Sequence, residues 1–193
     1  MQTYSHFIIT ASLNRFYRNK SSMTVHTSAL LLGSVLPDVP LVLLSALYFV
    51  DRWQAGTLND GGLFGIEYDT LYFSDPVWVT GHALFHAPLL ILLYLLIGYW
   101  FGVRGRQSWA RALFWLGVGC GLHSVIDILT HHNDGPLLLF PFDWSTRFSS
   151  PVSYWDPRHH GDSFALFEHV LNLILLGSLW VSWRRSRQVS LSD

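Results

Sequence analysis

Four apolar segments, each close to the length of a membrane-spanning helix, constrain this chain more than any other feature of its sequence. They cover residues 28–50, 83–103, 109–130 and 164–183. The hydrocarbon core of a bilayer requires about 20 apolar residues in a helix, so each segment can cross it. The sequence Pro37-Asp38-Val39-Pro40 interrupts the first segment. Because proline breaks helices, the alternative to one clean span there is a broken or re-entrant pair.

The composition agrees with a membrane protein. Hydrophobic residues make up 50% of the 193 residues and charged residues only 13%, whereas about 25% is usual in a soluble domain. Residues 3–18 have the apolar periodicity of a short amphipathic helix. The sequence therefore predicts an all-α, polytopic membrane bundle of about four transmembrane helices plus a short N-terminal helix, forming a single domain over residues 1–193.

Charge sets the partners and the orientation that we expect. A net charge of −1 without a basic tract argues against nucleic acid as a partner. The partner that we expect is the lipid bilayer. Positive residues gather at 15–20, 104–111 and 184–187, while the loops 51–81 and 131–163 are acidic. The positive-inside rule then places the basic connections and the C-terminus in the cytoplasm, and the acidic loops outside.

Within the third apolar segment, His123, Asp127 and His131 follow one another at intervals of four residues. Four residues advance about 400° around an α-helix, so the three side chains share one face. Imidazole and carboxylate together suit zinc or another divalent first-row metal. The alternative is local capping and an ion pair, but unpaired polar groups in an apolar helix are costly and usually functional. Because Cys120 is the single cysteine, a cysteine-rich metal site is excluded.

The predicted topology brings further ligand-type residues to the same outward side. His82 and His86 begin the second span, Glu168 begins the last span, and Asp38 lies at the break in the first segment. His6 joins them if the N-terminal helix starts in the outer leaflet. Each residue alone has a structural alternative as a cap or an interfacial side chain. Together they predict one metal site near the outer face.

Several short motifs give this chain a resemblance to a known family. The motifs are His6 after Thr3 and Ser5, Gly33-Ser34-Val35-Leu36-Pro37-Asp38, His82-Ala83-Leu84-Phe85-His86, and His123 to His131, followed by Pro141. Over residues 3–145 the pattern resembles the inner-membrane metal-dependent hydrolases associated with the bacterial SOS response. That family is itself similar in His/Asp pattern to zinc-dependent phospholipase C. The resemblance implies a bacterial inner-membrane location and metal-ligand or catalytic roles for His6, Asp38, His82, His86, His123, Asp127 and His131.

The chain also departs from the family pattern. Val39-Pro40 follows Asp38 where the family often has a second acidic residue, and His82 is not followed by an arginine. The last span has Glu168-His169 in place of the His-x-x-x-Glu of the phospholipase. These departures put a second or third metal in doubt.

The function that we expect is hydrolysis by water activated on one or two Zn²⁺ or similar ions. With two ions, Asp127 would bridge between His123 and His131, and Asp38 or Glu168 would act as general base. The depth of the site near the outer headgroups favours a lipid-like or phosphoester substrate. Two other functions stay open: a haem-binding membrane cytochrome with axial histidines, and a non-enzymatic metal or proton transporter.

Overall fold

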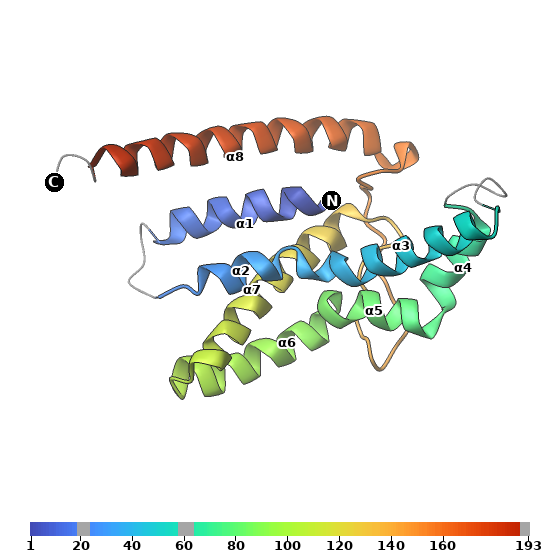
Figure 1. Cartoon of the computed structure of the whole chain (residues 1–193), viewed down its shortest axis with the longest axis horizontal. Coiled ribbons are helices and arrows are strands. Elements are labelled where there is room, and N and C mark those ends of the chain that lie inside the picture. The colour runs from blue at the N-terminus through green and yellow to red at the C-terminus, as the bar shows by residue number, and fades with distance from the viewer. Residues whose placement is uncertain (19–23, 58–63, 190–193) are drawn as a thin grey trace.

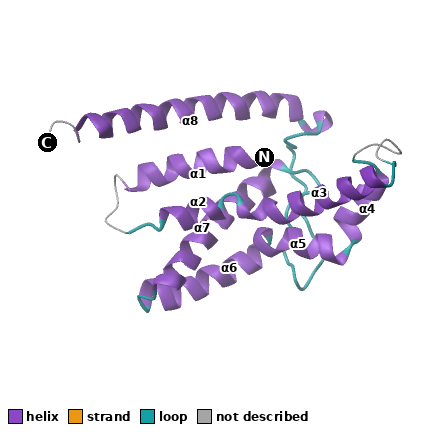
Figure 2. Ribbon diagram, viewed as in Figure 1, coloured by secondary structure: helices purple, strands orange, loops and turns teal. Residues whose placement is uncertain are grey.

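Helices build the protein. The computed structural model describes residues 1–18, 24–57 and 64–189, and the secondary structure there is helical apart from an isolated bridge between Leu137 and Arg147 (Figure 2). The elements follow in the order α1 (Thr3–Arg18), α2 (Thr27–Gly33), η1 (Leu36–Asp38), α3 (Val39–Gln54), α4 (Ile66–Ser74), α5 (Pro76–His86), α6 (Pro88–Ile97), η2 (Gly98–Arg104), α7 (Ser108–Thr130), η3 (Pro157–His159) and α8 (Gly161–Val189). This arrangement confirms the predicted all-α fold.

The membrane-spanning segments are of two kinds. Among the described residues, α7 and α8 are single helices long and apolar enough to cross a bilayer. Two bent pairs also pass this test: α2 with η1–α3, bent by 42°, and α5 with α6–η2, bent by 48°. Counting each pair as one span gives up to four spans by length and composition, as the sequence predicted.

The second span is longer and more bent than predicted. The prediction began it at residue 83, but α5 already begins at Pro76, where the Asp75 side chain accepts hydrogen bonds from the backbone of Val77 and Trp78. The bend lies at Ala87, which has a ψ of 123°. Because the ring of Pro88 disfavours helical geometry in the preceding residue, the chain leaves the helix for one residue and then resumes.

The prediction that 51–81 is a loop was wrong over most of its described residues. The helix α3 continues to Gln54, α4 covers Ile66–Ser74, and α5 follows. The polar composition concealed an aromatic face: the ring of Tyr68 meets those of Tyr48 and Trp78 edge-on, at centroid distances of 5.7 and 5.3 Å. Such edge-to-face pairs are favourable and hold α4 against α3 and α5. Residues 58–63 of the predicted loop lie outside the described residues.

The two ends of the chain lie along the same side of the bundle. Helix α1 matches the predicted range 3–18, and α8 runs beside it in the same direction (Figure 1). The Nδ2 atom of Asn172 donates to Ser5 Oγ at 2.7 Å, which ties the two helices together near their N-terminal ends. Of the basic cluster predicted at 15–20, residues 19 and 20 lie outside the described residues.

Glycines allow α2 to approach α7 very closely. A Cβ atom on Gly33 would lie 2.2 Å from the carbonyl oxygen of Leu116, and one on Gly119 would lie 2.2 Å from that of Leu30. Small residues of this kind let helix backbones come together in membranes. The contact lies one turn before His123 and therefore sets where the end of α2 meets the polar part of α7.

Candidate metal centre

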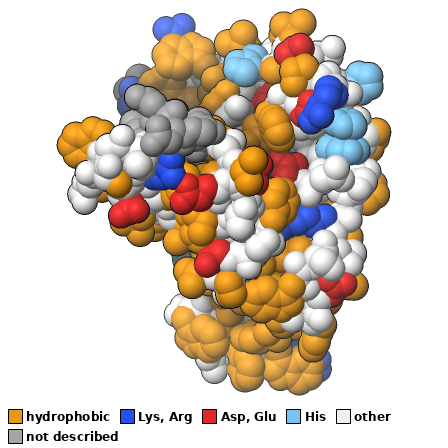
Figure 3. All heavy atoms as spheres, turned by 90° about the vertical axis from the view of Figure 1, so that its right-hand side faces the viewer, with side chains coloured by type: hydrophobic (Ala, Val, Ile, Leu, Met, Phe, Trp, Pro, Cys, Tyr) orange, Lys and Arg blue, Asp and Glu red, His pale blue; other side chains and the backbone are white. Residues whose placement is uncertain are grey.

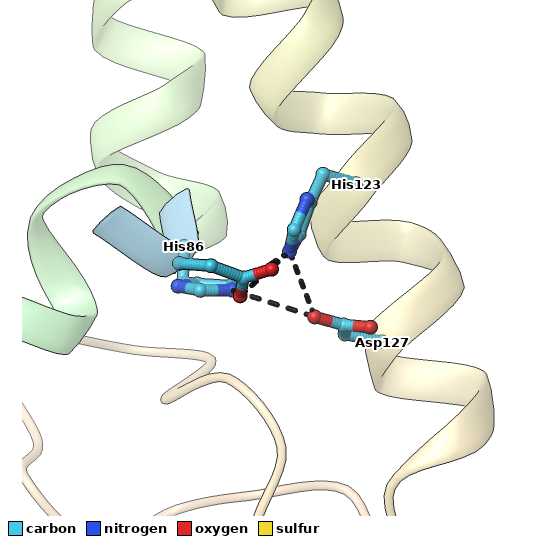
Figure 4. A group of neighbouring side chains, drawn as sticks. His86, His123 and Asp127 are labelled. Atoms are coloured by element: carbon cyan, nitrogen blue, oxygen red, sulfur yellow. Dashed lines mark hydrogen bonds and ion pairs between the residues drawn. The ribbon is translucent and has the colours of Figure 1, made fainter. Parts of the chain in front are cut away.

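Four ligand-type side chains converge where three segments meet. Asp38 comes from the end of η1, His86 from the end of α5, and His123 and Asp127 from successive turns of α7. One ligand atom from each lies within 4.8 Å of all the others. Figure 4 shows His86 pointing toward His123 and Asp127 across the gap between α5 and α7. The histidines and Asp127 are almost completely buried, and the Asp38 carboxylate is 21% exposed.

Backbone carbonyls fix the tautomers of both histidines. His86 Nδ1 lies 3.0 Å from the carbonyl oxygen of His82, and His123 Nδ1 lies 2.8 Å from that of Ser34. A carbonyl oxygen can only accept a hydrogen bond, so both Nδ1 atoms must carry hydrogen. In the neutral rings, each Nε2 atom then presents a lone pair to the centre.

Without a cation, this arrangement brings acceptors together. The two Nε2 atoms lie 3.1 Å apart, and His123 Nε2 lies 2.9 Å from Asp127 Oδ2 and 3.3 Å from Asp38 Oδ1. Two lone pairs and two carboxylates facing one point repel each other in an apolar surrounding. A divalent ion balances the two carboxylate charges, whereas a single proton leaves one of them unbalanced.

The spacing fits a tetrahedral metal ion. Zinc binds nitrogen and oxygen at about 2.0–2.2 Å in tetrahedral geometry, which places ligand atoms about 3.3 to 3.5 Å from one another. The separations between Nε2 of the two histidines and the nearest carboxylate oxygens are 2.9, 3.3, 3.4 and 3.6 Å. The hydrogen bond from each Nδ1 to a carbonyl is also the usual support of a metal-binding histidine. The residues present therefore fit a zinc-type ion.

A proline explains why the carbonyl of Ser34 is available. In a continuous α-helix this carbonyl would accept from the backbone N–H of Asp38. Pro37 instead starts a 3₁₀ turn, in which Asp38 N donates to Val35 O at 3.2 Å. The freed carbonyl of Ser34 then receives His123 Nδ1–H. The break predicted in the first span thus brings the candidate ligand Asp38 to the group and fixes the tautomer of His123.

The other oxygen of Asp127 faces a second group of polar atoms. Asp127 Oδ1 lies 3.0 Å from His6 Nε2, 3.5 Å from His131 Nε2 and 2.9 Å from the amino nitrogen of Met1. The ring of His6 stacks on that of His123 at a centroid distance of 3.7 Å. Both ring nitrogens of His6 are buried, and neither makes an aligned hydrogen bond in the described chain. Asp127 therefore connects two clusters through its two oxygens.

The structure places the remaining predicted residues differently. His131 lies just after the end of α7, with an extended backbone, so it does not continue the helical face of His123 and Asp127. His82 is buried and packs against the ring of His86 at 4.3 Å, but it is outside the group of four. Glu168 is also outside that group: it is 1% exposed and accepts a hydrogen bond from the backbone N–H of Gln2 at 2.8 Å.

Sequence reasoning missed three residues that support the centre. The hydroxyl of Thr3 donates to Asp38 Oδ2, and the hydroxyl of Ser124 donates to the carbonyl of His86 at 2.6 Å. Asp134 Oδ1 lies 3.3 Å from His131 Nδ1. Only Asp134 gave a signal in the sequence, because it follows His131 by three residues. The other two contacts depend on which helices become neighbours.

The pair of His131 and Asp134 is electrostatically coupled. Burial works against the charged form of each group. The carboxylates of Asp127 and Asp134 outweigh it for His131, whose pKa is raised above its usual value. His131 in turn outweighs burial for Asp134, whose pKa is lowered. Both groups therefore favour their charged forms in the metal-free protein.

A cavity of about 870 Å³ opens from the centre to the surface. Asp38, Asp127 and His131 lie at its inner end. Its lining includes the apolar Leu41 and Val42 of α3 and polar residues of the loop that follows α7. Figure 3 shows acidic and histidine side chains gathered at this end of the molecule among hydrophobic ones. The cavity thus offers a polar end at the centre and an apolar side along α3.

Comparison with known proteins decides the family. The family model described as "YdjM inner membrane protein" matches residues 1–190. The chain belongs to this family. No curated protein and no solved structure matches the chain significantly. Membership agrees with the helical bundle and its apolar spans. Because the family is described as an inner membrane protein, it also confirms the predicted membrane location.

Proposed function

We propose that this protein is a membrane-embedded, metal-dependent hydrolase. The observation that carries the proposal is the convergence of two histidine lone pairs and two carboxylates, with both histidine tautomers fixed by backbone carbonyls. A zinc-type ion held by Asp38, His86, His123 and Asp127 would have to take a water as a fifth ligand, or release one carboxylate for it, and would then lower the pKa of that water to near 7. Asp127 Oδ1, His6 and His131 offer a place for a second ion beside the first.

The chain's own residues would orient the reacting groups. Asp38 is the most exposed of the four ligands, and Thr3 holds its second oxygen, so it is the member of the group that is accessible from the cavity. Glu168, the other general base that the sequence suggests, lies outside the group and does not line the cavity; it is buried behind Gln2, which does line the cavity and whose backbone N–H donates to it. In hydrolysis the base takes the proton of the attacking water and returns it to the leaving group.

The cavity supports an amphiphilic substrate. Two of the proposed ligands, Asp38 and Asp127, line the cavity, and so do Leu41 and Val42 of α3, the second of which is 60% exposed. A lipid-like phosphoester could place its headgroup at the centre and its chain along α3. The positive-inside pattern supports an orientation in which this end of the bundle faces outward and the C-terminus faces the cytoplasm.

The same geometry speaks against a haem whose axial ligands are His86 and His123. Axial histidines bind iron from opposite faces of the macrocycle, so their Nε2 atoms must have a porphyrin between them. His86 Nε2 and His123 Nε2 lie 3.1 Å apart with Asp127 Oδ2 within 3.4 Å of both. No ring plane fits among these atoms. The transport alternative shares the metal centre and needs a functional test.

Elemental analysis of purified protein tests the centre, and an assay with soluble and lipid phosphodiesters tests the reaction. We expect stoichiometric zinc or another divalent metal in the wild type, and its loss with hydrolysis in Asp127→Ala. Asp162→Asn, on the exposed first turn of α8, is the matched control and should keep both. Wild-type protein without bound metal would refute the centre. Bound metal without hydrolysis, but with metal uptake by proteoliposomes, would favour a transporter.

A further inference from the structure

A groove lies between α1 and α8 at the end of the molecule opposite the metal centre. It has a volume of about 590 Å³, and its polar lining comes from Arg15, Ser178, Ser182, Arg185 and Ser186. The two helices run in the same direction, so the arginine-rich C-terminal turns of both lie at this end (Figure 1). The groove is separate from the cavity that leads to Asp38 and Asp127.

Neutral groups hold the guanidinium of Arg15 in the groove. Its Nε atom donates to Ser182 Oγ at 2.8 Å and its Nη2 atom to Ser186 Oγ at 2.6 Å. Across the described ranges, neither Arg15 nor Arg185 pairs with a carboxylate, and the groove lining contains no acidic residue. Two positive charges therefore face the same groove without a negative partner from the described chain.

The other arginines of this turn behave differently. Arg184 lies over the ring of Trp180 at 5.3 Å, and Arg187 lies over that of Trp183 at 4.4 Å. These cation–π pairs hold both guanidinium groups against partly exposed tryptophans rather than in the groove. Tryptophan and arginine near the end of a spanning helix mark the headgroup level of the bilayer. The groove is therefore at the depth of lipid phosphates.

The ligand that suits this groove is a phosphate-bearing anion. Guanidinium groups bind phosphate oxygens through paired, charge-assisted hydrogen bonds, and serine hydroxyls can donate to the same oxygens. The C-terminal ends of α1 and α8 carry partial negative charge, which works against an anion. The arginine charges must therefore supply the attraction, and both are needed.

We propose that this groove binds the phosphate headgroup of an anionic phospholipid, which bridges Arg15 of α1 and Arg185 of α8. Only 11% of the membrane window of α8 is buried inside the protein, so a lipid bridge would add to the two hydrogen bonds by which Arg15 already holds this end of α8. The other hydrogen bonds of α8 to α1, which involve His169 and Asn172, and the bond of Glu168 to Gln2 just before α1 lie toward the opposite end. The lipid would hold the second end of α8 to the bundle. The site is independent of the proposed hydrolase activity.

Lipid titration followed by native mass spectrometry tests the proposal. Detergent-purified full-length protein is titrated with phosphatidylglycerol, with phosphatidylcholine, and with inorganic phosphate. We expect one phosphatidylglycerol to bind preferentially to the wild type. The double variant Arg15→Gln/Arg185→Gln should weaken that binding at least tenfold more than Arg184→Gln/Arg187→Gln does. This control removes the same charge from the neighbouring tryptophan face. Circular dichroism of each variant checks that the helices are intact.

The outcomes separate the sources of phosphate. Equal weakening in the two double variants would mean attraction by net charge alone and would overturn the proposal. Equal binding of phosphatidylcholine would overturn the need for an anion. Inorganic phosphate that displaces phosphatidylglycerol at similar concentration would assign the groove to free phosphate instead of lipid. If Arg15→Gln/Arg185→Gln loses helicity, phosphatidylglycerol binding by the single variant Arg185→Gln replaces it as the test. This variant should keep the fold, because Arg185 donates to no other helix in the described chain.

Discussion

Replacing Pro37 with alanine should weaken metal binding and leave the bundle folded. The backbone N–H of Asp38 donates to Val35 O because Pro37 holds the chain in a 3₁₀ turn. Alanine would allow a continuous α-helix, in which the same N–H donates to the carbonyl of Ser34. That carbonyl now accepts from His123 Nδ1 at 2.8 Å. The variant therefore makes a backbone N–H compete with a proposed ligand for one acceptor.

The size of the effect follows from the contacts involved. Loss of a hydrogen-bond partner behind a metal ligand typically lowers metal affinity 10- to 100-fold. Pro37 is fully buried, so losing two ring carbons costs about 1.6 kcal/mol at 0.8 kcal/mol per CH₂. Alanine restores a backbone N–H at position 37, and a hydrogen bond from this group would offset about 1 kcal/mol of the loss. The melting temperature should consequently change by about 4 °C or less.

Zinc affinity can be measured by competition with a chelating dye, and the melting temperature by differential scanning fluorimetry. Pro40→Ala is the matched control. Pro40 lies in the first turn of α3, where a missing N–H breaks no helical hydrogen bond. Pro40→Ala should keep wild-type affinity. If Pro37→Ala binds zinc as tightly as Pro40→Ala does, the proposed role of the Ser34 carbonyl is wrong.

Three further outcomes are expected. Gly119→Ala should destabilise the protein by about 1–3 kcal/mol because the added Cβ would lie 2.2 Å from Leu30 O. The control Gly121→Ala, whose Cβ would lie 3.6 Å from Ile91 Cγ2, should instead stabilise it by up to about 1 kcal/mol through helix propensity. Thermal melts of both variants test the close approach of α2 and α7. Chelation should lower the melting temperature of the wild type, since metal at 100 times its dissociation constant adds about 2.7 kcal/mol to stability; an unchanged melt would speak against a structural ion. Glu168→Gln keeps an acceptor for Gln2 N–H, so the variant should retain the fold and the metal. If Glu168 is the general base, hydrolysis should fall at least 100-fold. Full activity of the variant would show that Glu168 is not the base.

The sequence was most informative where one helix carries the whole signal. The interval between His123 and Asp127 is a property of α7 alone, and the structure brings both into the same cluster at 2.9 Å. The N-terminal helix at 3–18 and the range of α7 follow equally from local periodicity and length, whereas α8, predicted over 164–183, covers Gly161–Val189. The four-residue interval failed at His131 because α7 ends at Thr130. His131 Nε2 still lies 3.5 Å from Asp127 Oδ1, but the residue is no longer part of the helix.

Contacts between helices were beyond the reach of local patterns. The short helix α4 was hidden because it lies within an acidic stretch that was interpreted as a loop, while the aromatic rings that stabilise it pack against α3 and α5. The sequence also ranked His82 with His86 as a ligand pair. On α5 only His86 points into the cluster, and the contribution of His82 to that cluster is its backbone carbonyl. No spacing rule separates these two roles.

The two bends of the spans and two of the four ligands coincide, and the reason is physical. A broken helix in a membrane exposes carbonyls that lipid cannot satisfy. At the first bend the Ser34 carbonyl accepts from His123 Nδ1, and at the second the His86 carbonyl accepts from Ser124 Oγ at 2.6 Å. Each break therefore gains its missing hydrogen bond from α7, next to the turn that supplies the metal ligands. At the first bend one contact both fixes the tautomer of His123 and satisfies a free carbonyl, and at the second bend the contact with Ser124 holds the backbone of His86. A substitution that straightens either bend should therefore disturb the centre even though it removes no candidate ligand.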